Sequence, residues 1–231
     1  MPEKNPSSPI PVTIRLGDAE ALAHGSEKVV YLHPDRPDWV VKVREFRRDG
    51  QTNPWWDRAL LHLSKRHEMH WLLREIEASA ILMNQPDRPN VPLPVAIYHG
   101  LEMTDLGPAV IAQRVSLPKH PLGLRLWKIK RTNGLKQTHV DALNEFVARA
   151  VAWNVPMTDP NPGNLIFGQR GSGRREIVLV DGFGDYSLLH WRIRSSRINS
   201  RINARKFKAL ADRLELDWDK KTMQFRLRNQ S

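Results

Sequence analysis

The chain has 231 residues, a formal net charge of +11 and no cysteine. This length can bury a core as one domain or as two small lobes. The missing cysteine excludes disulfides, thiolate nucleophiles and zinc sites that need Cys ligands. The first thirty residues hold no apolar signal core and no apolar run is long enough for a membrane span, so we expect a cytoplasmic protein.

The positive charge is concentrated at the C-terminal end. Residues 190–231 contain twelve Lys or Arg and four Asp or Glu, which is +8 of the total +11. A basic segment beside a balanced domain favours an anionic partner, such as nucleic acid, an acidic lipid surface or another acidic molecule. The alternative is an ordinary solvated helix face.

The N-terminal part begins with a Pro- and Ser-rich segment, residues 1–12, which we expect to be a disordered leader. Two short β-branched runs, 29–32 and 39–43, then predict a hairpin around a Pro- and Asp-rich turn. Lys42 would lie inside the second strand of this hairpin.

A polar insert over 44–66 precedes an amphipathic helix predicted over 69–83. The apolar stripe of that helix is predicted to comprise Met69, Leu72, Leu73, Ile76, Ala80 and Met83. Two further strands are expected over 92–98 and 109–115, because both stretches are apolar and end near Gly or Pro turns.

Residues 116–137 are rich in Pro, Gly and Lys and predict a linker. Thr138 and Asp141 then form a capping-box pattern that would open a helix ending before Pro156. The next predicted element is a hairpin with strands at 164–167 and 176–180.

A last helix is predicted over 197–216. A basic stripe is predicted along it, with cations that recur at three- and four-residue spacing: Arg194, Arg197, Arg201, Arg205 and Lys208. The neighbouring apolar face is predicted to comprise Ile198, Ile202, Phe207, Leu210 and Leu214. We therefore expect the stripe to face outward, where it could bind an anionic partner.

Two motifs carry the strongest chemical signal. Asp159 and Asn164 lie five residues apart on a turn-rich segment, and Asp181 follows the strand predicted over 176–180. A kinase-type catalytic loop has this Asp-to-Asn spacing, with a metal-binding Asp after the next strand. The residues predict a phosphoryl-transfer site in which Asp159 orients the acceptor hydroxyl while Asn164 and Asp181 hold Mg²⁺. The alternative is two Asx and Gly turns that close β-hairpins.

Lys42 would supply the cation that such a site needs on the nucleotide phosphates. Taken singly, a strand Lys is more often a surface residue. Burial would require a carboxylate partner on the following helix, where Glu75 and Glu77 are the candidates. The helical phase favours Glu77, which lies closer to the apolar stripe.

Two weaker candidates lie nearby in the sequence. Asp185 could replace or assist Asp181 as a metal ligand. Gly25, just before the first strand, would let backbone amides approach a phosphate. The chain contains neither a Walker A sequence nor G-x-G-x-x-G, which excludes a P-loop nucleotide site and a Rossmann dinucleotide site.

These residues make the chain similar to the YrbL-type family of small bacterial kinase-like proteins, named for the PhoP regulatory network. The similarity runs from about Gly25 to Trp191. It is carried by Lys28–Pro34, Val41–Val43, Arg74–Glu77, Thr104–Pro108, Asn161–Asn164 and Val180–Asp185.

The resemblance implies an α+β, bilobal, protein-kinase-like fold with a strand-rich N-terminal lobe (13–115) and a reduced helical C-terminal lobe (116–231). It implies ATP and Mg²⁺ as cofactors. It also implies an ion pair between Lys42 and Glu75 and a hinge from Gln113 to Val115 that receives the adenine.

The chain departs from the kinase pattern in four places. Met157 occupies the usual His position, and the glycine loop has lost most of its glycines. Gly182 and Phe183 alter the Asp-Phe-Gly order, and only residues 182–231 remain for a substrate lobe. These departures argue against a peptide acceptor and leave small-molecule, sugar or lipid phosphorylation. The alternative function is a catalytically weak pseudokinase that binds nucleotide as a regulatory module.

Overall fold

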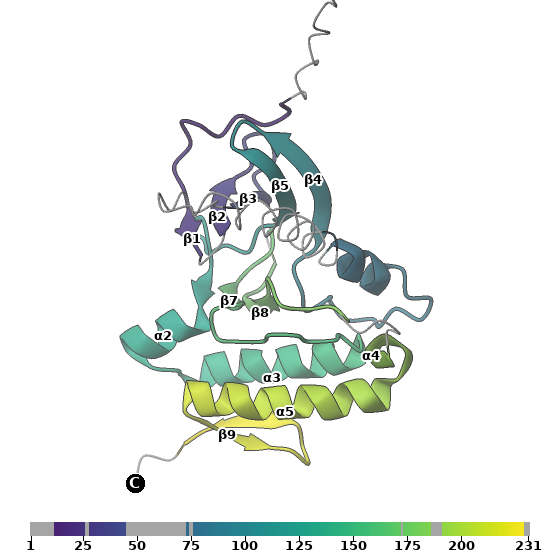
Figure 1. The fold of residues 1–231 in the computed structure, drawn as a ribbon. Helices are drawn as coiled ribbons and strands as arrows, with labels where there is room; N and C mark the ends of the chain where they lie inside the picture. Colours follow the sequence, from purple (N-terminus) through teal and green to yellow (C-terminus); the bar gives the residue numbers. More distant parts are fainter. Residues whose placement is uncertain are drawn as a thin grey trace, which may run out of the picture.

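The computed structural model describes residues 12–25, 28–44, 73, 76–171, 173–185 and 191–228. A five-stranded sheet forms one end of the molecule, and helices α3 (Gln137–Ala152) and α5 (Ser196–Leu214) form the other. A small three-stranded sheet lies between these two ends (Figure 1). The predicted α+β fold, with a strand-rich N-terminal lobe and a helical C-terminal lobe, is confirmed.

The five-stranded sheet is antiparallel in the order β1-β2-β3-β5-β4. Its strands are β1 (Ala23–His24), β2 (Lys28–Leu32), β3 (Trp39–Arg44), β4 (Tyr98–Thr104) and β5 (Gly107–Gln113). The predicted hairpin is confirmed as β2 and β3, with Lys42 paired to Val30 across the strands. β3 is central in the sheet and buried along most of its length, which explains its continuous β-branched run.

The strand expected over 92–98 was placed too early, because β4 begins only at Tyr98. Within 92–97, Val95 forms an isolated bridge to Leu179. Gly100 and Glu102 interrupt the apolar pattern of β4, and the register with β5 shifts between Tyr98 and Gly100. The sequence signal was weak because this strand is irregular and partly exposed.

The leader (1–11), most of the polar insert (45–66) and the first part of the following helix lie outside the described residues. Residues 76–83 are helical, as expected. Ala78 and Leu82 are buried in the core, each at most 6% exposed, and Ile76 and Met83 of the predicted stripe pack against it. The predicted stripe was therefore partly wrong, since Leu73 is 50% exposed.

Residues 116–137 contain more structure than a linker. β6 (Leu124–Arg125) pairs with β7 (Leu165–Gly168), which pairs with β8 (Glu176–Leu179), so the predicted second hairpin is confirmed. Helix α2 (Leu126–Asn133) was missed, because its sequence is basic and only Leu126 and Ile129 are buried.

The start of α3 also differs from the prediction. The N-cap is Lys136, whose backbone N–H donates to Nδ1 of His139 at 3.0 Å. Asp141 lies inside the helix and accepts a bond from Gln137 instead of capping it. The predicted Thr138 capping box is therefore wrong, since a His at the N3 position takes that role.

A buried ion pair joins α3 to β8. Arg149 bonds to the Glu176 carboxylate and donates to the Ile177 carbonyl at 2.9 Å. Arg170 also reaches Glu176, at 2.7 Å. Arg149 and Glu176 are 5% and 8% exposed, so the pair sits within the fold and not at its surface.

Two helices and a hairpin are the last elements of the described part: α4 (Trp191–Arg194), α5, β9 (Leu216–Asp219) and β10 (Gln224–Leu227). Ser195 caps α5, as its hydroxyl accepts from the Ile198 N–H. Phe207, Leu210 and Leu214 are buried as predicted, whereas Ile198 is 42% exposed. The terminal hairpin was not predicted.

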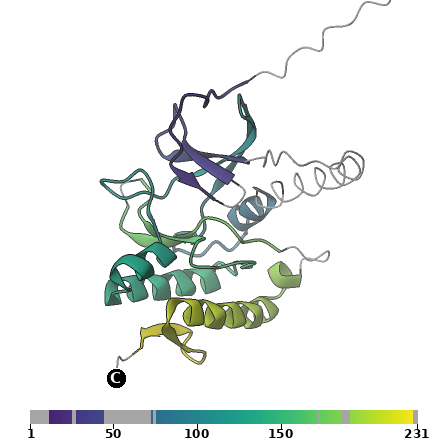
Figure 2. The ribbon, with the colours of Figure 1, turned by 60° about the vertical axis from the view of Figure 1, so that its left-hand side comes forward.

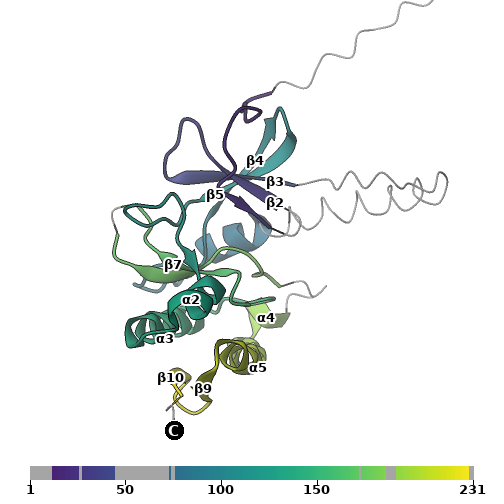
Figure 3. The ribbon, with the colours of Figure 1, turned by 90° about the vertical axis from the view of Figure 1, so that its left-hand side faces the viewer.

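The main hydrophobic core is continuous between the two ends of the molecule. One cluster includes Val40 and Val110 of the five-stranded sheet, Phe146 of α3 and Phe207 of α5. Figures 2 and 3 show the same stacking from two further sides, with the β9–β10 hairpin next to α5. None of the described helices has both the length and the apolar character to cross a membrane. The predicted lobe boundary at residue 115 stays a prediction.

Candidate functional site

The two predicted motifs lie against each other. The backbone N–H groups of Thr158 and Asp159 both donate to the Gly182 carbonyl, each at 2.8 Å. The Gly184 N–H donates to the Pro156 carbonyl, also at 2.8 Å. The segment that carries Asp159 and the turn that carries Asp181 thus form one hydrogen-bonded unit.

Gly182 allows this close approach. Its φ angle is +77°, and a Cβ atom at this position would lie 2.6 Å from the Asp159 carbonyl oxygen. A side chain here would meet both an unfavourable backbone conformation and a direct clash. The next residue, Phe183, is fully buried, and its ring centroid lies 5.6 Å from that of Tyr98.

Lys42 is buried, at 8% exposure, and its ammonium group reaches this unit. Nζ donates to the Val180 carbonyl at 2.8 Å and to the Tyr98 hydroxyl at 3.1 Å. The Tyr98 hydroxyl donates in turn to the Val180 carbonyl at 2.9 Å. The surface-lysine alternative is therefore wrong, and the structure places Lys42 beside the residue that precedes Asp181.

The carboxylate partner of Lys42 stays a prediction. Glu75 lies outside the described residues. Glu77, which the helical phase favoured, is exposed, and this argues against it as the partner of a buried ammonium group.

Asn164 is oriented by the Asp159 backbone. Its Nδ2 donates to the Asp159 carbonyl at 3.0 Å, so its Oδ1 is the atom left for a cation. Asn161 shapes the same turn, because its Oδ1 accepts from the Gly163 N–H at 2.7 Å while its Nδ2 reaches an Asp159 carboxylate oxygen. The Asp159 side chain itself is exposed.

Asp181 pairs with a residue that sequence reasoning did not single out. Lys28, at the start of β2, lies 3.3 Å from its Oδ2. The Gly182 N–H donates to Oδ1 at 2.8 Å. Lys28 follows the predicted Gly25 turn, in which Gly25 N–H bonds to the Lys28 carbonyl at 2.7 Å. The sequence signal that could have indicated Lys28 as a site residue was a cation close to the predicted Gly25 turn.

Asp185 has a different environment from Asp181. It is 9% exposed, and its Oδ2 accepts from the Arg192 and Ile193 N–H groups at 2.7 and 3.3 Å. These bonds hold the first turn of α4. Its geometry favours a structural role and leaves Asp181 as the better metal ligand of the two.

The predicted hinge connects β5 to the rest of the chain. Gln113 N–H donates to the Ile97 carbonyl at 2.8 Å, and the Val115 carbonyl accepts from the Gly123 N–H at 2.8 Å. Gln113 Oε1 is buried and has no hydrogen-bond donor among the residues that the structure describes.

Helix α5 holds the segment before Asp159, a role that sequence reasoning missed. Asn199 and Asn203, both at most 2% exposed, each donate to the Val155 carbonyl, at 3.1 and 2.8 Å. Arg192 Nη2 bridges the Met157 carbonyl and Asn203 Oδ1, at 2.8 and 2.7 Å. The Ser-Arg-Ile-Asn repeat was the available signal, since it places both Asn side chains on one helix face.

Lys206 continues this polar face toward Asp159. Its ammonium group donates to the Thr158 carbonyl, next to Asp159 in the chain. Burial and the Arg192 charge lower the pKa of Lys206, and the Asp159 charge partly opposes this. A half-buried cation therefore lies beside the predicted acceptor-orienting carboxylate.

Arg197, Arg201 and Arg205 are all exposed on the other side of α5, as predicted. Asn199 and Asn203 face inward and are also four residues apart, two positions after Arg197 and Arg201. The Asn and Arg side chains therefore lie on opposite sides of the helix.

Mg²⁺ fits the donor types present at the site. Asn164 offers an amide oxygen and Asp181 a carboxylate, which are ligands that Mg²⁺ takes together with substrate phosphates. Among the described residues, no group of three or more His, Cys, Asp or Glu could hold a metal by itself.

The five-stranded sheet and the later helical part, with the Asp159–Asn164 turn and the Asp181 turn beside each other, define an α+β protein. A family model described as "PhoP regulatory network protein YrbL" matches residues 14–215, and the chain belongs to this family. The predicted family is thereby confirmed. None of the curated protein sequences matches the chain.

Solved kinase domains resemble the chain at low identity. The Mycobacterium tuberculosis PknI kinase domain is 17% identical, with a TM-score of 0.41, over 70% of this chain and 57% of that domain. The PF14_0431 kinase domain is 15% identical, with a TM-score of 0.44, over 71% of this chain and 50% of that domain. The chain thus spans little more than half the length of these domains, and their activities do not transfer at this distance.

Proposed function

We propose that the protein binds ATP with Mg²⁺ and transfers the γ-phosphoryl group to an acceptor of unidentified structure. One observation carries this proposal: a buried lysine, an Asp–Asn loop and a strand-exit Asp meet at residues 180–182. The β7–β8 hairpin by itself brings Asn164 beside Val180, but it gives no reason for a buried lysine from β3 to bond to the Val180 carbonyl next to Asp181.

Each residue has a distinct part in the proposed reaction. Lys42 would bind the phosphates, and Asn164 Oδ1 with the Asp181 carboxylate would hold Mg²⁺, which would supply neutralisation of the phosphate charge. Lys28, which lies beside Asp181, would be a second cation for the phosphates. Asp159 orients the acceptor hydroxyl and accepts its proton.

The hinge supports a nucleotide at this site. The buried acceptor Gln113 Oε1 has no donor among the described residues, and an unsatisfied buried acceptor is costly. The exocyclic amine of adenine is a donor that would satisfy it. The proposed function thus gives a reason for an otherwise unexplained polar atom.

The second candidate function is a pseudokinase that binds MgATP without turnover. Met157 favours it, because this residue is fully buried and pairs with Phe183 where kinases usually carry a polar His. Nucleotide binding is common to both candidates, so it is the first property to test.

Replacing Lys42 by Met or Asp181 by Asn should each weaken MgATP binding by about tenfold or more, the effect of losing one charge-assisted contact. The Met side chain fills the buried volume of Lys42 and removes only its charge. Isothermal titration calorimetry of the full chain measures the affinity.

Lys220→Ala and Asp87→Asn are the matched controls, because both residues are exposed and lie outside the site. They should bind MgATP as the wild type does. If both site variants keep the wild-type MgATP affinity and the wild-type unfolding transition, then Lys42 and Asp181 do not form the MgATP site.

The basic stripe Arg197, Arg201 and Arg205 is proposed as a separate contact for a polyanion. Changing all three to Gln should flatten the dependence of duplex DNA binding on salt by about one unit of log–log slope per lost phosphate contact. Fluorescence anisotropy at several salt concentrations measures the slope. MgATP affinity should stay unchanged, and an unaltered slope would identify the stripe as an ordinary solvated face.

A further inference from the structure

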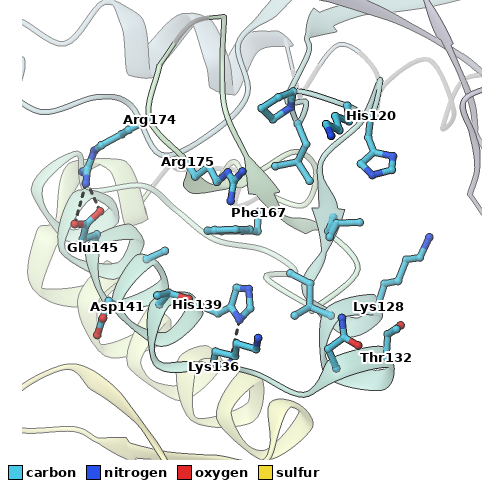
Figure 4. Close-up of a pocket in the computed structure, with 18 residues that line it drawn as sticks. His120, Lys128, Thr132, Lys136, His139, Asp141, Glu145, Phe167, Arg174 and Arg175 are labelled. Carbon is cyan, nitrogen blue, oxygen red and sulfur yellow. Dashed lines mark hydrogen bonds and ion pairs between the residues drawn. The ribbon is translucent and has the colours of Figure 1, made fainter.

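A cavity lies away from the proposed ATP site. It has a volume of about 950 Å³, is open to solvent on one side and is lined by residues of α2, α3, strand β7 and the 117–120 loop (Figure 4). Lys42, Asp159, Asn164 and Asp181 are not among its lining residues. The volume is at the upper end of the range found for small-molecule sites.

The inner wall of the cavity is apolar. It includes Leu124, Ile129, Ala142 and the half-buried ring of Phe167. The Phe167 ring meets His139 edge-on, with 5.0 Å between ring centroids. Figure 4 shows Phe167 between Arg175 and His139, in the middle of the labelled side chains. A flat apolar group could therefore lie against this wall.

The rim of the cavity is mostly basic, because its lining residues include five Lys or Arg and two carboxylates, Asp141 and Glu145. Lys119, Lys128, Lys136 and Arg175 are exposed and form no ion pair within the described part of the chain. Arg174 differs, because it pairs with Glu145 at 2.9 Å. Like charges around one concave surface concentrate a positive potential there, which attracts anions.

His139 is a natural reporter for this cavity. Its Nδ1 accepts the Lys136 N–H, so the neutral ring carries its proton on Nε2. Burial and the Lys136 charge lower the pKa of His139. An anion bound nearby would stabilise the protonated ring and raise that pKa.

We propose that this cavity binds a small amphiphilic anion, an apolar ring or chain that carries a phosphate, sulfonate or carboxylate group. The apolar part lies against Phe167, and the anionic group lies among Lys128, Lys136 and Arg175. This site is independent of the proposed kinase activity, since the two share no lining residue.

The test uses the full chain and 8-anilinonaphthalene-1-sulfonate, an aromatic anion that fluoresces when bound in an apolar site. We expect saturable binding that MgATP does not displace. The uncharged N-phenyl-1-naphthylamine should bind at least about tenfold more weakly, because it lacks the anionic contact.

Variants locate the site. Lys128→Gln with Lys136→Gln should weaken binding of the sulfonate about tenfold. Lys220→Gln with Lys221→Gln removes the same charge from exposed residues outside both the cavity and the basic stripe, and should leave it unchanged. Equal losses in both double variants, or displacement by MgATP, would overturn the proposal.

Competition and NMR complete the experiment. 1-Naphthyl phosphate and 1-naphthoate, added as competitors, distinguish a phosphate from a carboxylate headgroup. The bound anion should raise the pKa of His139 but not of His99, whose pKa burial also lowers and which lies on β4. Failure of both competitors to displace the sulfonate, or equal shifts for the two histidines, would contradict the site.

Discussion

Asp159→Asn is expected to lower phosphoryl transfer by about 10² to 10⁴-fold, the usual range for a positioned general base. The amide keeps the size of the side chain but cannot accept the acceptor's proton. MgATP affinity should stay at the wild-type level, because the Asp159 side chain is exposed and Lys42, Asn164 and Asp181 make the nucleotide contacts in the proposed site. Single-turnover ATP hydrolysis, with water as the acceptor, measures the effect without a known substrate.

The Asp159 result separates the two candidate functions. Asp87→Asn, an exposed change elsewhere, should hydrolyse ATP as the wild type does. Wild-type turnover in Asp159→Asn would remove Asp159 from the reaction. A wild-type protein that binds MgATP but shows no turnover would support the pseudokinase.

Glu176→Gln is expected to destabilise the fold by about 3–5 kcal/mol, the usual cost of leaving one member of a buried ion pair without its partner. Arg149 of α3 is 5% exposed and pairs with Glu176 of β8, so water cannot replace the lost carboxylate. Burial already lowers the pKa of Arg149, and Glu176 is the main group that opposes this. Urea denaturation followed by circular dichroism measures the free energy of unfolding.

Glu145→Gln is a matched control for Glu176→Gln. Glu145 lies one helical turn before Arg149 and pairs with Arg174, but this pair is exposed. An exposed pair contributes about 0–1 kcal/mol. Equal losses in the two variants would show that the Arg149–Glu176 pair is no more important than a surface contact.

Local sequence patterns predicted several elements that carry the proposed site. The β-branched runs around Lys42 and before Asp181 indicated strands because alternating and buried strands have a strong composition signal. The Pro, Gly and Asn content of 159–164 indicated a turn for the same reason. Helix α2 and strand β4 were missed or misplaced, because their exposed and irregular residues weaken that signal.

The sequence by itself therefore determined the hairpin with Lys42, the turn from Asp159 to Asn164 and the strand that ends at Asp181. Tertiary structure alone decided that Lys42 meets the Val180 carbonyl, that Lys28 pairs with Asp181, and that the Asn199 and Asn203 side chains hold the backbone before Asp159. The physical reason is distance along the chain. Turn and strand preferences act between neighbours, whereas these contacts join segments more than forty residues apart and depend on how the whole core packs.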